Sequence, residues 1–407
     1  MAIDPHRLPT VKGSRRAQVP AFEVMAILDR VAALRSGGSD VVSLCAGEPS
    51  GGAPTDVREL AARAHAGDDA LGYTPALGRA ELRTAVAGHY RRWYDLDVDP
   101  ASVAITTGAS GAFVLLFLAA FDAGDRVAVT RPGYPAYRNL LHSLGVEVVD
   151  IPVGPASGFQ PTVDALESLT SASGPLQGLV LASPANPTGS MVDRRGLAAL
   201  TDWCAANGVR LISDEIYHGI TYPPDRHAPD ARGTTAASLD PAAVVVSSFS
   251  KYWGMTGWRL GWCLLPDDLR DAVDALAGNV ALCPPTPAQV AALGAFTERS
   301  YAEADARIDE LTVTRHLLLD SLDRLGWGPV APAAGAFYLW AGIGEQLGDH
   351  PDSVSWCRAL LDQAGVALVP GTDMDSVDGG SFVRLSFAAG PAAVAEALDR
   401  IVAFQHG

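Results

Sequence analysis

Three observations in the 407-residue sequence predict an α/β fold, with a mostly parallel central sheet flanked by helices and a smaller α+β domain. Hydrophobic residues make up 48% of the chain, so it can bury a large core. Between residues 103 and 265, apolar runs of strand length alternate with helical segments, which is typical of βαβ units. After about Pro287 this alternation gives way to a long helical pattern and then to short strands.

Composition excludes several classes of function. The net charge of −16 and the lack of any Lys/Arg-rich run disfavour nucleic acid and anionic membranes as partners. The longest apolar run, residues 112–121, is too short to span a bilayer, and the first residues lack a signal-peptide core. Five scattered cysteines form no metal-binding cluster and no disulfide framework. We therefore expect a soluble cytoplasmic protein without a metal site.

In chain order, residues 1–18 are expected to form a polar arm, and residues 19–34 a helix that ends at a Ser-Gly-Gly sequence. A short strand at 41–44 then meets a glycine-rich turn at 46–52. We expect a large domain at 45–287 and a small domain that combines 19–44 with 288–407.

The large domain contains most of the predicted elements. A Gly/Pro-marked loop at 71–78 precedes a charged helix at 79–93, and the strand at 103–107 runs into an apolar helix. Further strands are predicted at 126–130, 146–151, 178–182, 209–213, 244–247 and 260–265, with helices at 137–144 and 197–206. In the small domain we predict helices at 288–325, 353–364 and 392–404, and strands at 336–340 and 382–387.

The segment after the strand at 103–107 was tested against two common motifs. A nucleophile elbow requires Gly-x-Ser-x-Gly, but Ala112 occupies its last position. A dinucleotide fingerprint requires a second glycine where Ser110 stands. Both motifs are excluded, whereas small residues at a helix start still suit a phosphate.

Five chemically distinctive residues directly follow predicted strands. They are Gly108, Tyr134, Asn186, Asp214 and Lys251. Because the carboxyl ends of parallel strands meet at one edge of a sheet, we expect these residues to lie close together.

Lys251 is unusual because only two of the 30 basic residues are lysines, the other being Lys12. A neutral primary amine can attack an aldehyde and form an imine, whereas guanidinium stays protonated. Small hydroxyl residues precede Lys251, and Arg259 follows among glycines and tryptophans. This pattern predicts an amine that meets a ligand whose anionic end is held by serine and arginine.

Together these residues resemble the class I/II aminotransferases, which are pyridoxal-phosphate-dependent transferases of fold type I. The resemblance extends from about residue 20 to the C-terminus. Its most specific parts are Ser-x-Ser-Lys at 248–251 and Met-Thr-Gly-Trp-Arg-Leu-Gly at 255–261. It implies pyridoxal 5'-phosphate as cofactor, an amino acid and a 2-oxo acid as substrates, and a ping-pong transfer.

The resemblance also implies roles for residues around the cofactor ring. Lys251 matches the lysine that forms the internal aldimine and later moves the substrate proton. Asp214 matches the aspartate that pairs with the pyridine nitrogen. Tyr217 and Asn186 match the partners of the phenolic oxygen. Tyr134 falls where an aromatic ring stacks on the pyridine, and its neighbour Tyr137 is the alternative core aromatic of that pair.

Further roles concern the cofactor phosphate and the substrate. The phosphate cradle is expected from Gly108, Ala109, Ser110, Ser248 and Arg259. Tyr73 resembles the tyrosine that reaches the phosphate of the neighbouring subunit, which implies a homodimer with shared active sites. Arg384 matches the arginine that grips the substrate α-carboxylate, with the backbone of Gly47 close by.

The identity of the amino donor depends on the segments that border the substrate. No second arginine for a distal carboxylate is evident, and Phe22 lies in an apolar segment where the substrate side chain is expected. We therefore expect a neutral or aliphatic donor, such as valine or alanine, over an aspartate-type dicarboxylate. The loops at 50–52 and 373–375 depart from the family pattern, and we expect both to border the substrate.

Two other functions stay open at this point. The same fold and cofactor also support elimination, decarboxylation or amine oxidation, because the ring activates several bonds of the substrate. A non-enzymatic sensor domain of a transcription regulator is the third reading. The short stretch before residue 19 disfavours it, because it leaves no room for a DNA-binding domain.

Overall fold

The computed structural model describes residues 13–67, 70–226 and 228–407. A seven-stranded sheet forms its centre, in the order β2-β8-β7-β6-β5-β3-β4. The strands of this sheet are β2 (Val103–Thr106), β3 (Arg126–Arg131), β4 (Glu147–Pro152), β5 (Gly178–Ala182), β6 (Arg210–Asp214), β7 (Val244–Ser248) and β8 (Gly261–Leu264). β8 alone runs antiparallel to its neighbours within this sheet, so the predicted, mostly parallel sheet is confirmed.

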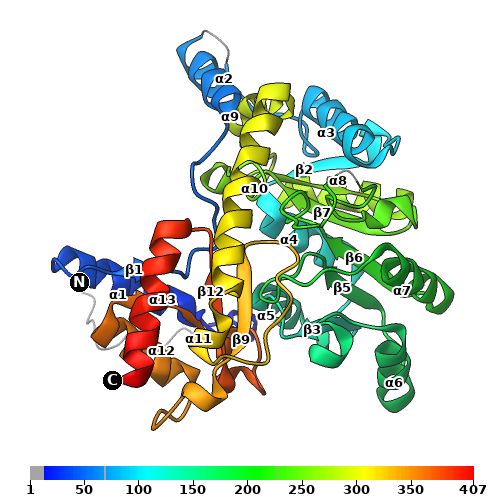
Figure 1. Cartoon of the computed structure of the whole chain (residues 1–407). Helices are drawn as coiled ribbons and strands as arrows, with labels where there is room; N and C mark the ends of the chain where they lie inside the picture. Colours follow the sequence, from blue (N-terminus) through cyan, green and yellow to red (C-terminus); the bar gives the residue numbers. More distant parts are fainter. Residues whose placement is uncertain (1–12, 68–69, 227) are drawn as a thin grey trace, which may run out of the picture.

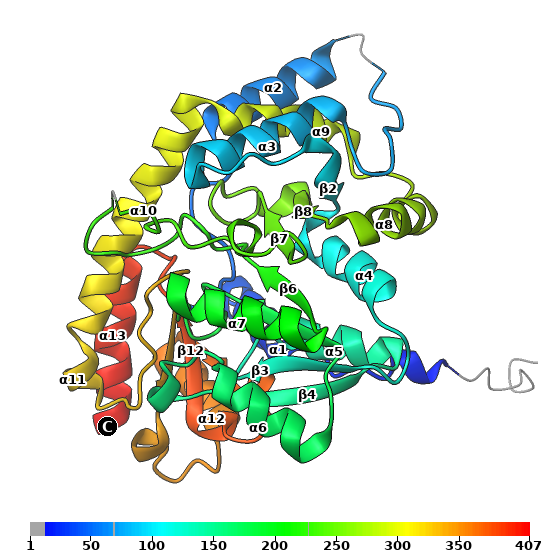
Figure 2. The same ribbon diagram turned by 90° about the vertical axis from the view of Figure 1, so that its right-hand side faces the viewer.

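Helices cover both faces of this sheet (Figures 1 and 2). One face packs under α4 (Gly108–Ala120), α5 (Pro135–Leu144) and α8 (Asp267–Val280), and the other under α3 (Ala80–Tyr94), α6 (Val163–Ser173) and α7 (Arg194–Asn207). β7 illustrates why both faces are apolar. Val244 and Val246 join the core on the α4 side, and Val245 joins the core on the α7 side. Such a strand is buried on both faces, which is typical of a parallel sheet.

A smaller antiparallel sheet follows in the C-terminal part, in the order β11-β12-β9. Its strands are β9 (Tyr338–Gly342), β11 (Val369–Pro370) and β12 (Phe382–Ser386). Beside it, β1 (Val42–Ser43) pairs in parallel with β10 (Val366–Ala367). The helices near these strands are α1 (Glu23–Ser36), α12 (Ser353–Ala364) and α13 (Pro391–His406), which lie together in Figure 1. The N-terminal segment thus packs with the C-terminal part.

The predicted helix over 288–325 is wrong as one unit. The chain forms α9 (Thr286–Ala292), a 3-10 turn at Leu293–Phe296, α10 (Glu298–Leu319) and α11 (Leu322–Leu325). Gly294 packs so closely on α2 (Thr55–Ala66) that an added Cβ would lie 2.7 Å from the carbonyl of Asp56. Thr297 then adopts an extended conformation and caps α10 through Ser300 N. This close contact and the new cap separate the helices.

Other boundaries also differ from the sequence-based prediction. Ala336 has a φ of 56°, which a strand cannot adopt, so β9 begins at Tyr338 and not at residue 336. The first helix begins at Glu23 rather than residue 19, because Phe22 is still extended. Three helices, α2, α6 and α8, are present where none is predicted from the sequence. Of the predicted arm, residues 1–12 with Lys12 lie outside the described residues, and Arg15–Ala17 form a 3-10 turn.

Within the described ranges, no helix is long and apolar enough to cross a membrane.

Candidate active site

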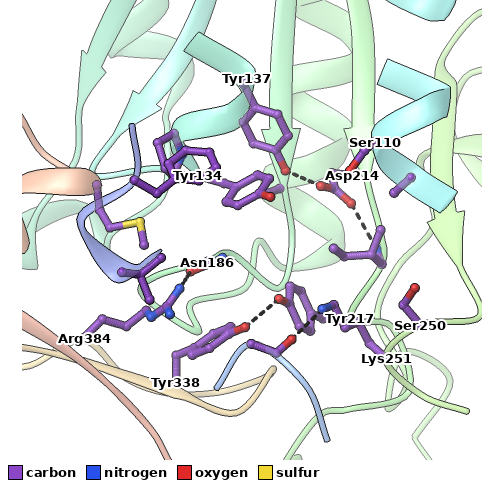
Figure 3. A pocket seen from close by; sticks show the side chains of 18 of the residues that line it. Ser110, Tyr134, Tyr137, Asn186, Asp214, Tyr217, Ser250, Lys251, Tyr338 and Arg384 are labelled. Atoms are coloured by element: carbon purple, nitrogen blue, oxygen red, sulfur yellow. Dashed lines mark hydrogen bonds between the residues drawn. The ribbon is translucent and has the colours of Figure 1, made fainter. Parts of the chain in front are cut away.

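A pocket lies at the carboxyl ends of the parallel strands, between the large sheet, the small sheet and α1 (Figure 3). It brings together most of the residues singled out in the sequence. Those that line it are Phe22, Gly47, Ala109, Ser110, Tyr134, Asn186, Asp214, Tyr217, Ser248, Lys251, Arg259 and Arg384. The structure therefore places side chains from distant segments at one edge of the sheet, where parallel α/β folds carry their ligands.

Lys251 follows β7 and points into the pocket (Figure 3). Its Nζ donates a hydrogen bond of 2.6 Å to the carbonyl of Gly47, and lies 5.8 Å from the centre of the Tyr217 ring. Burial, followed by the nearby Arg384, lowers the pKa of Lys251 from 10.5 to about 8. More of the amine is therefore neutral and nucleophilic at pH 7 to 8 than in an ordinary lysine.

Asp214 ends β6 and is buried, with only 2% of its surface exposed. Its Oδ2 accepts a hydrogen bond from the Tyr137 hydroxyl, and its Oδ1 accepts one of 3.1 Å from Ile216 N. Burial raises the pKa of Asp214 to about 6, whereas these two hydrogen bonds and Lys251 oppose that rise. The site thus holds a carboxylate that stays ionised at neutral pH despite its burial.

Four tyrosines surround the space between Lys251 and Asp214. The hydroxyls of Tyr217 and Tyr338 lie 3.0 Å apart, and the rings of Tyr134 and Tyr137 meet edge to face with centroids 5.4 Å apart. Tyr338 was missed in the sequence, because it sits at the start of a short strand with no motif around it. Tyr137 was considered only as a core aromatic, but its hydroxyl contacts Asp214.

One end of the pocket is rich in hydrogen-bond donors. The N-terminus of α4 lines it with Ala109 and Ser110, opposite Ser248 and Arg259. Gly108 does not line the pocket but makes it possible. With φ at 68°, a Cβ here would lie 2.5 Å from Nη2 of Arg259. Glycine thus lets the helix start and the guanidinium approach each other.

Arg384 occupies the other end, on the central strand β12 of the small sheet. Nη1 donates to Oδ1 of Asn186 and Nη2 to the carbonyl of Cys45, both at 3.1 Å. The residue is only 4% exposed, yet its Nε has no hydrogen-bond partner among the described residues. A buried unpaired donor is costly, so this guanidinium is suited to an anionic ligand.

Tyr73 lies away from these residues. Its side chain is 84% exposed and belongs to a separate hollow with Thr107 and Cys283. Within this single chain it contributes nothing to the pocket.

The mouth of the pocket is apolar. Phe22, Met25 and Leu28 line it from the N-terminal segment, and Met374 lines it from the loop after β11. Asp373 lies on the same loop. The expectation that this loop borders the substrate space agrees with its position here, whereas residues 50–52 do not line the pocket.

Comparison with known proteins decides the family. Residues 39–401 match the model of the family described as aminotransferase class I and II. The chain belongs to this family. The aminotransferase is 50% identical to a valine–pyruvate aminotransferase from Mycobacterium tuberculosis, over 95% of this chain and 96% of that protein. It is 34% identical to an aspartate/prephenate aminotransferase from Thermus thermophilus, over 95% of this chain and 97% of that protein.

Solved structures agree with this assignment. A crystal structure of an aminotransferase from Mycobacterium tuberculosis matches with a TM-score of 0.92 and 48% identity, covering 98% of this chain and 100% of that one. The structure of aspartate aminotransferase from Thermus thermophilus with maleate matches with a TM-score of 0.88 and 32% identity. The match covers 97% of this chain and 100% of that one. The predicted fold type I architecture is confirmed. The protein is a pyridoxal-phosphate-dependent aminotransferase, which moves an amino group between an amino acid and a 2-oxo acid.

The pocket of the aminotransferase fits this cofactor. A phosphate suits the helix start at Ala109 and Ser110, because the absence of a Cβ at Gly108 lets the Arg259 guanidinium pack directly beside it. A pyridine ring suits the space between Asp214 and Lys251, which supply a buried carboxylate and a primary amine.

Proposed function

We propose that Lys251, Asp214 and Arg384 carry the reaction on bound pyridoxal phosphate, with a neutral amino acid as the preferred donor. The observation that supports this most is their convergence, from β7, β6 and β12, on one pocket. When bound, pyridoxal phosphate supplies an aldehyde carbon for the amino group and a ring that withdraws electrons.

Each of the three residues then has a distinct task. Lys251, with its lowered pKa, supplies the amine that holds the cofactor and later moves the proton of the substrate Cα. Asp214 keeps the ring nitrogen protonated, because a buried carboxylate strongly favours a proton beside it. Arg384 grips the substrate carboxylate, and Asn186 fixes the guanidinium by accepting a hydrogen bond from Nη1.

The neighbouring residues position the cofactor. Tyr217 and Asn186 line the pocket and would hold the phenolic oxygen of the cofactor, and Tyr134 would offer its ring to the pyridine. Ala109, Ser110, Ser248 and Arg259 hold the phosphate around the backbone of Gly108. Phe22 borders the substrate side chain. The backbone of Gly47 passes near the substrate carboxylate, and a Cβ added at Gly47 would lie 3.4 Å from the Tyr338 hydroxyl.

Two further proposals concern the assembly and its place in the cell. The exposed Tyr73 is available to the phosphate site of a second copy, so we propose a homodimer with shared sites. The negative net charge and the free, mostly buried cysteines suit the cytoplasm.

The donor preference rests on the apolar mouth of the pocket. Phe22, Met25, Leu28 and Met374 line it, and the 50%-identical relative is named for valine and pyruvate. We therefore propose a neutral aliphatic donor, such as valine or alanine, and pyruvate as a suitable acceptor. A dicarboxylate donor is the alternative, because other relatives are named for aspartate.

Steady-state kinetics on a panel of donors tests this proposal. Valine, alanine, leucine, aspartate and glutamate are compared as kcat/KM, with pyruvate or 2-oxoglutarate as acceptor. We expect valine or alanine to exceed aspartate by at least about tenfold. A higher kcat/KM for aspartate contradicts the neutral-donor proposal. Repeated turnover without any 2-oxo acid, beyond the one product per active site of the first half-reaction, would indicate elimination or decarboxylation instead.

A further inference from the structure

The helix α1 begins without a cap of its own. Phe22 occupies its N-cap position, where an aromatic side chain offers no acceptor for the first backbone N–H groups. The acceptor comes from Asp373, some 350 positions along the chain. Its Oδ1 accepts from Glu23 N at 2.9 Å, and its Oδ2 accepts from Val24 N at 3.1 Å. Both carboxylate oxygens are thus used to hold the start of α1.

The loop that carries Asp373 is itself fixed to the large sheet. Arg131, at the end of β3, donates to Asp375 Oδ1 at 2.6 Å, and both side chains are nearly buried. Gly133 N donates to the carbonyl of Met374 at 3.0 Å. Asp373 therefore has a defined position relative to β3, and through its cap it gives α1 a defined position as well.

This cap determines what covers the pocket mouth. Met25 and Leu28 lie within the first two turns of α1, and both line the pocket although they are partly exposed to solvent. Met374, directly after Asp373, also lines it and belongs to the same hydrophobic cluster as Val24 of α1. The held helix thus presents an apolar wall to the ligand.

Charges around the pocket are distributed unevenly. Its basic lining residues are Lys251, Arg259 and Arg384, and the proposed function assigns all three to the cofactor or the α-carboxylate. The acidic lining residues are Asp214, at the end of β6, and Asp373, at the start of α1. A side-chain carboxylate of a substrate would find no unassigned cation among the described residues that line the pocket, and it would face the like charge of Asp373.

We propose that Asp373 is the residue that sets the preference for neutral over dicarboxylate donors. It does so by holding α1 as an apolar wall and by repelling a second anionic group. This inference rests on the proposed function, because it takes the α-carboxylate to lie at Arg384. A like charge across a partly desolvated pocket changes relative binding by about tenfold.

Three variants test it in the holoenzyme. Asp373→Asn keeps the side-chain volume and one hydrogen-bond acceptor but removes the charge. Asp373→Ala removes the acceptors as well as the charge. Glu23→Gln is the matched control, because it removes an exposed negative charge from the same helix end without changing the pocket lining. The readout is the ratio of kcat/KM for aspartate to kcat/KM for valine.

We expect the ratio to rise by about fivefold or more in both Asp373 variants and to stay within about twofold in Glu23→Gln. A loss of folding alone would lower both rates and leave the ratio unchanged. The inference is overturned if the ratio is unchanged in Asp373→Asn, or if Glu23→Gln changes it equally. If the wild type prefers aspartate, the proposed donor is wrong. The change in the aspartate-to-valine ratio between the wild type and the Asp373 variants is measured separately from that preference.

Hydrogen exchange supplies a second test that requires no active variant. The amides of Glu23 and Val24 should be protected in the wild type, and should exchange at least about tenfold faster in Asp373→Ala. Exchange of these two amides at the rate of an open chain in the wild type would refute the cap and, with it, the proposed role of Asp373.

Discussion

The hydroxyl of Tyr137 donates a hydrogen bond to Oδ2 of Asp214, so a tyrosine on α5 stabilises the carboxylate at the end of β6. This carboxylate is otherwise destabilised, because burial raises its pKa to about 6. The hydrogen bond therefore keeps Asp214 ionised in the pH range where the proposed reaction needs its charge.

Replacing Tyr137 with phenylalanine should remove the hydrogen bond that keeps Asp214 ionised. A hydrogen bond to a charged group is worth about 1.5–3 kcal/mol, so the pKa of Asp214 should rise by about one unit or more in Tyr137→Phe. We expect kcat at neutral pH to fall by about tenfold and the acidic limb of the kcat profile to move to higher pH. Tyr222→Phe is a control, because it removes a half-buried tyrosine hydroxyl that donates to the carbonyl of Ala336 and does not line the pocket. An unchanged acidic limb in Tyr137→Phe would contradict this account.

Substrate binding should depend on the planar fork of Arg384. Lysine keeps the charge, but it cannot donate to Asn186, Cys45 and a ligand in the same geometry. We expect Arg384→Lys to raise KM for the amino donor by about 100-fold, with little change in cofactor affinity. Arg358→Lys is a suitable control, because Arg358 does not line the active-site pocket. An equal loss of cofactor affinity would place Arg384 at the cofactor and not at the substrate.

The phosphate end can be tested at Gly108. Alanine here combines a positive φ with a Cβ only 2.5 Å from Arg259, so the guanidinium must move. We expect Gly108→Ala to weaken pyridoxal phosphate binding by at least about tenfold, measured by absorbance or fluorescence titration. At Gly88, within α3, a Cβ meets nothing within 4 Å. Gly88→Ala should therefore leave cofactor binding unchanged, and equal weakening in both variants would refute the cradle.

Lys251 should lower the stability of the apoprotein. Its folded pKa of about 8 lies below its ordinary 10.5, so the unfolded state binds the proton more tightly. The resulting penalty is fully present below about pH 8 and disappears as the pH approaches 10.5. We expect Lys251→Met to raise the free energy of unfolding by about 1–2 kcal/mol at pH 7. Chemical denaturation at pH 7 and pH 10 measures this, and a gain that is larger at pH 10 would contradict it.

The sequence predicted the central sheet well, because each of its strands is an apolar run bounded by a change in composition. Four of the five strand-end residues, Tyr134, Asn186, Asp214 and Lys251, line one pocket, since parallel strands place their carboxyl ends at one edge. Helix breaks were less predictable. The helical pattern of residues 288–325 is continuous, and only the close approach of Gly294 to Asp56 shows where the chain must turn.

Contacts between distant segments explain what the sequence analysis missed in the site. The Tyr338 hydroxyl meets the Tyr217 hydroxyl, and the Cys45 carbonyl meets Arg384, only after the two sheets pack together. The cap of α1 by Asp373 likewise has no local signature, because capping motifs are normally read within a few residues. Such pairs depend on tertiary packing, so a single sequence does not reveal them.

The central claim is that Lys251 binds the cofactor covalently, and the chain offers a natural control because Lys12 is its only other lysine. The holoenzyme is reduced with borohydride, digested and analysed by mass spectrometry in the wild type, Lys12→Arg and Lys251→Arg. We predict one cofactor adduct, on the peptide that contains Lys251, retained in Lys12→Arg and absent in Lys251→Arg. An adduct that persists in Lys251→Arg, or a wild type that takes up pyridoxal phosphate without any adduct at Lys251, would contradict the account.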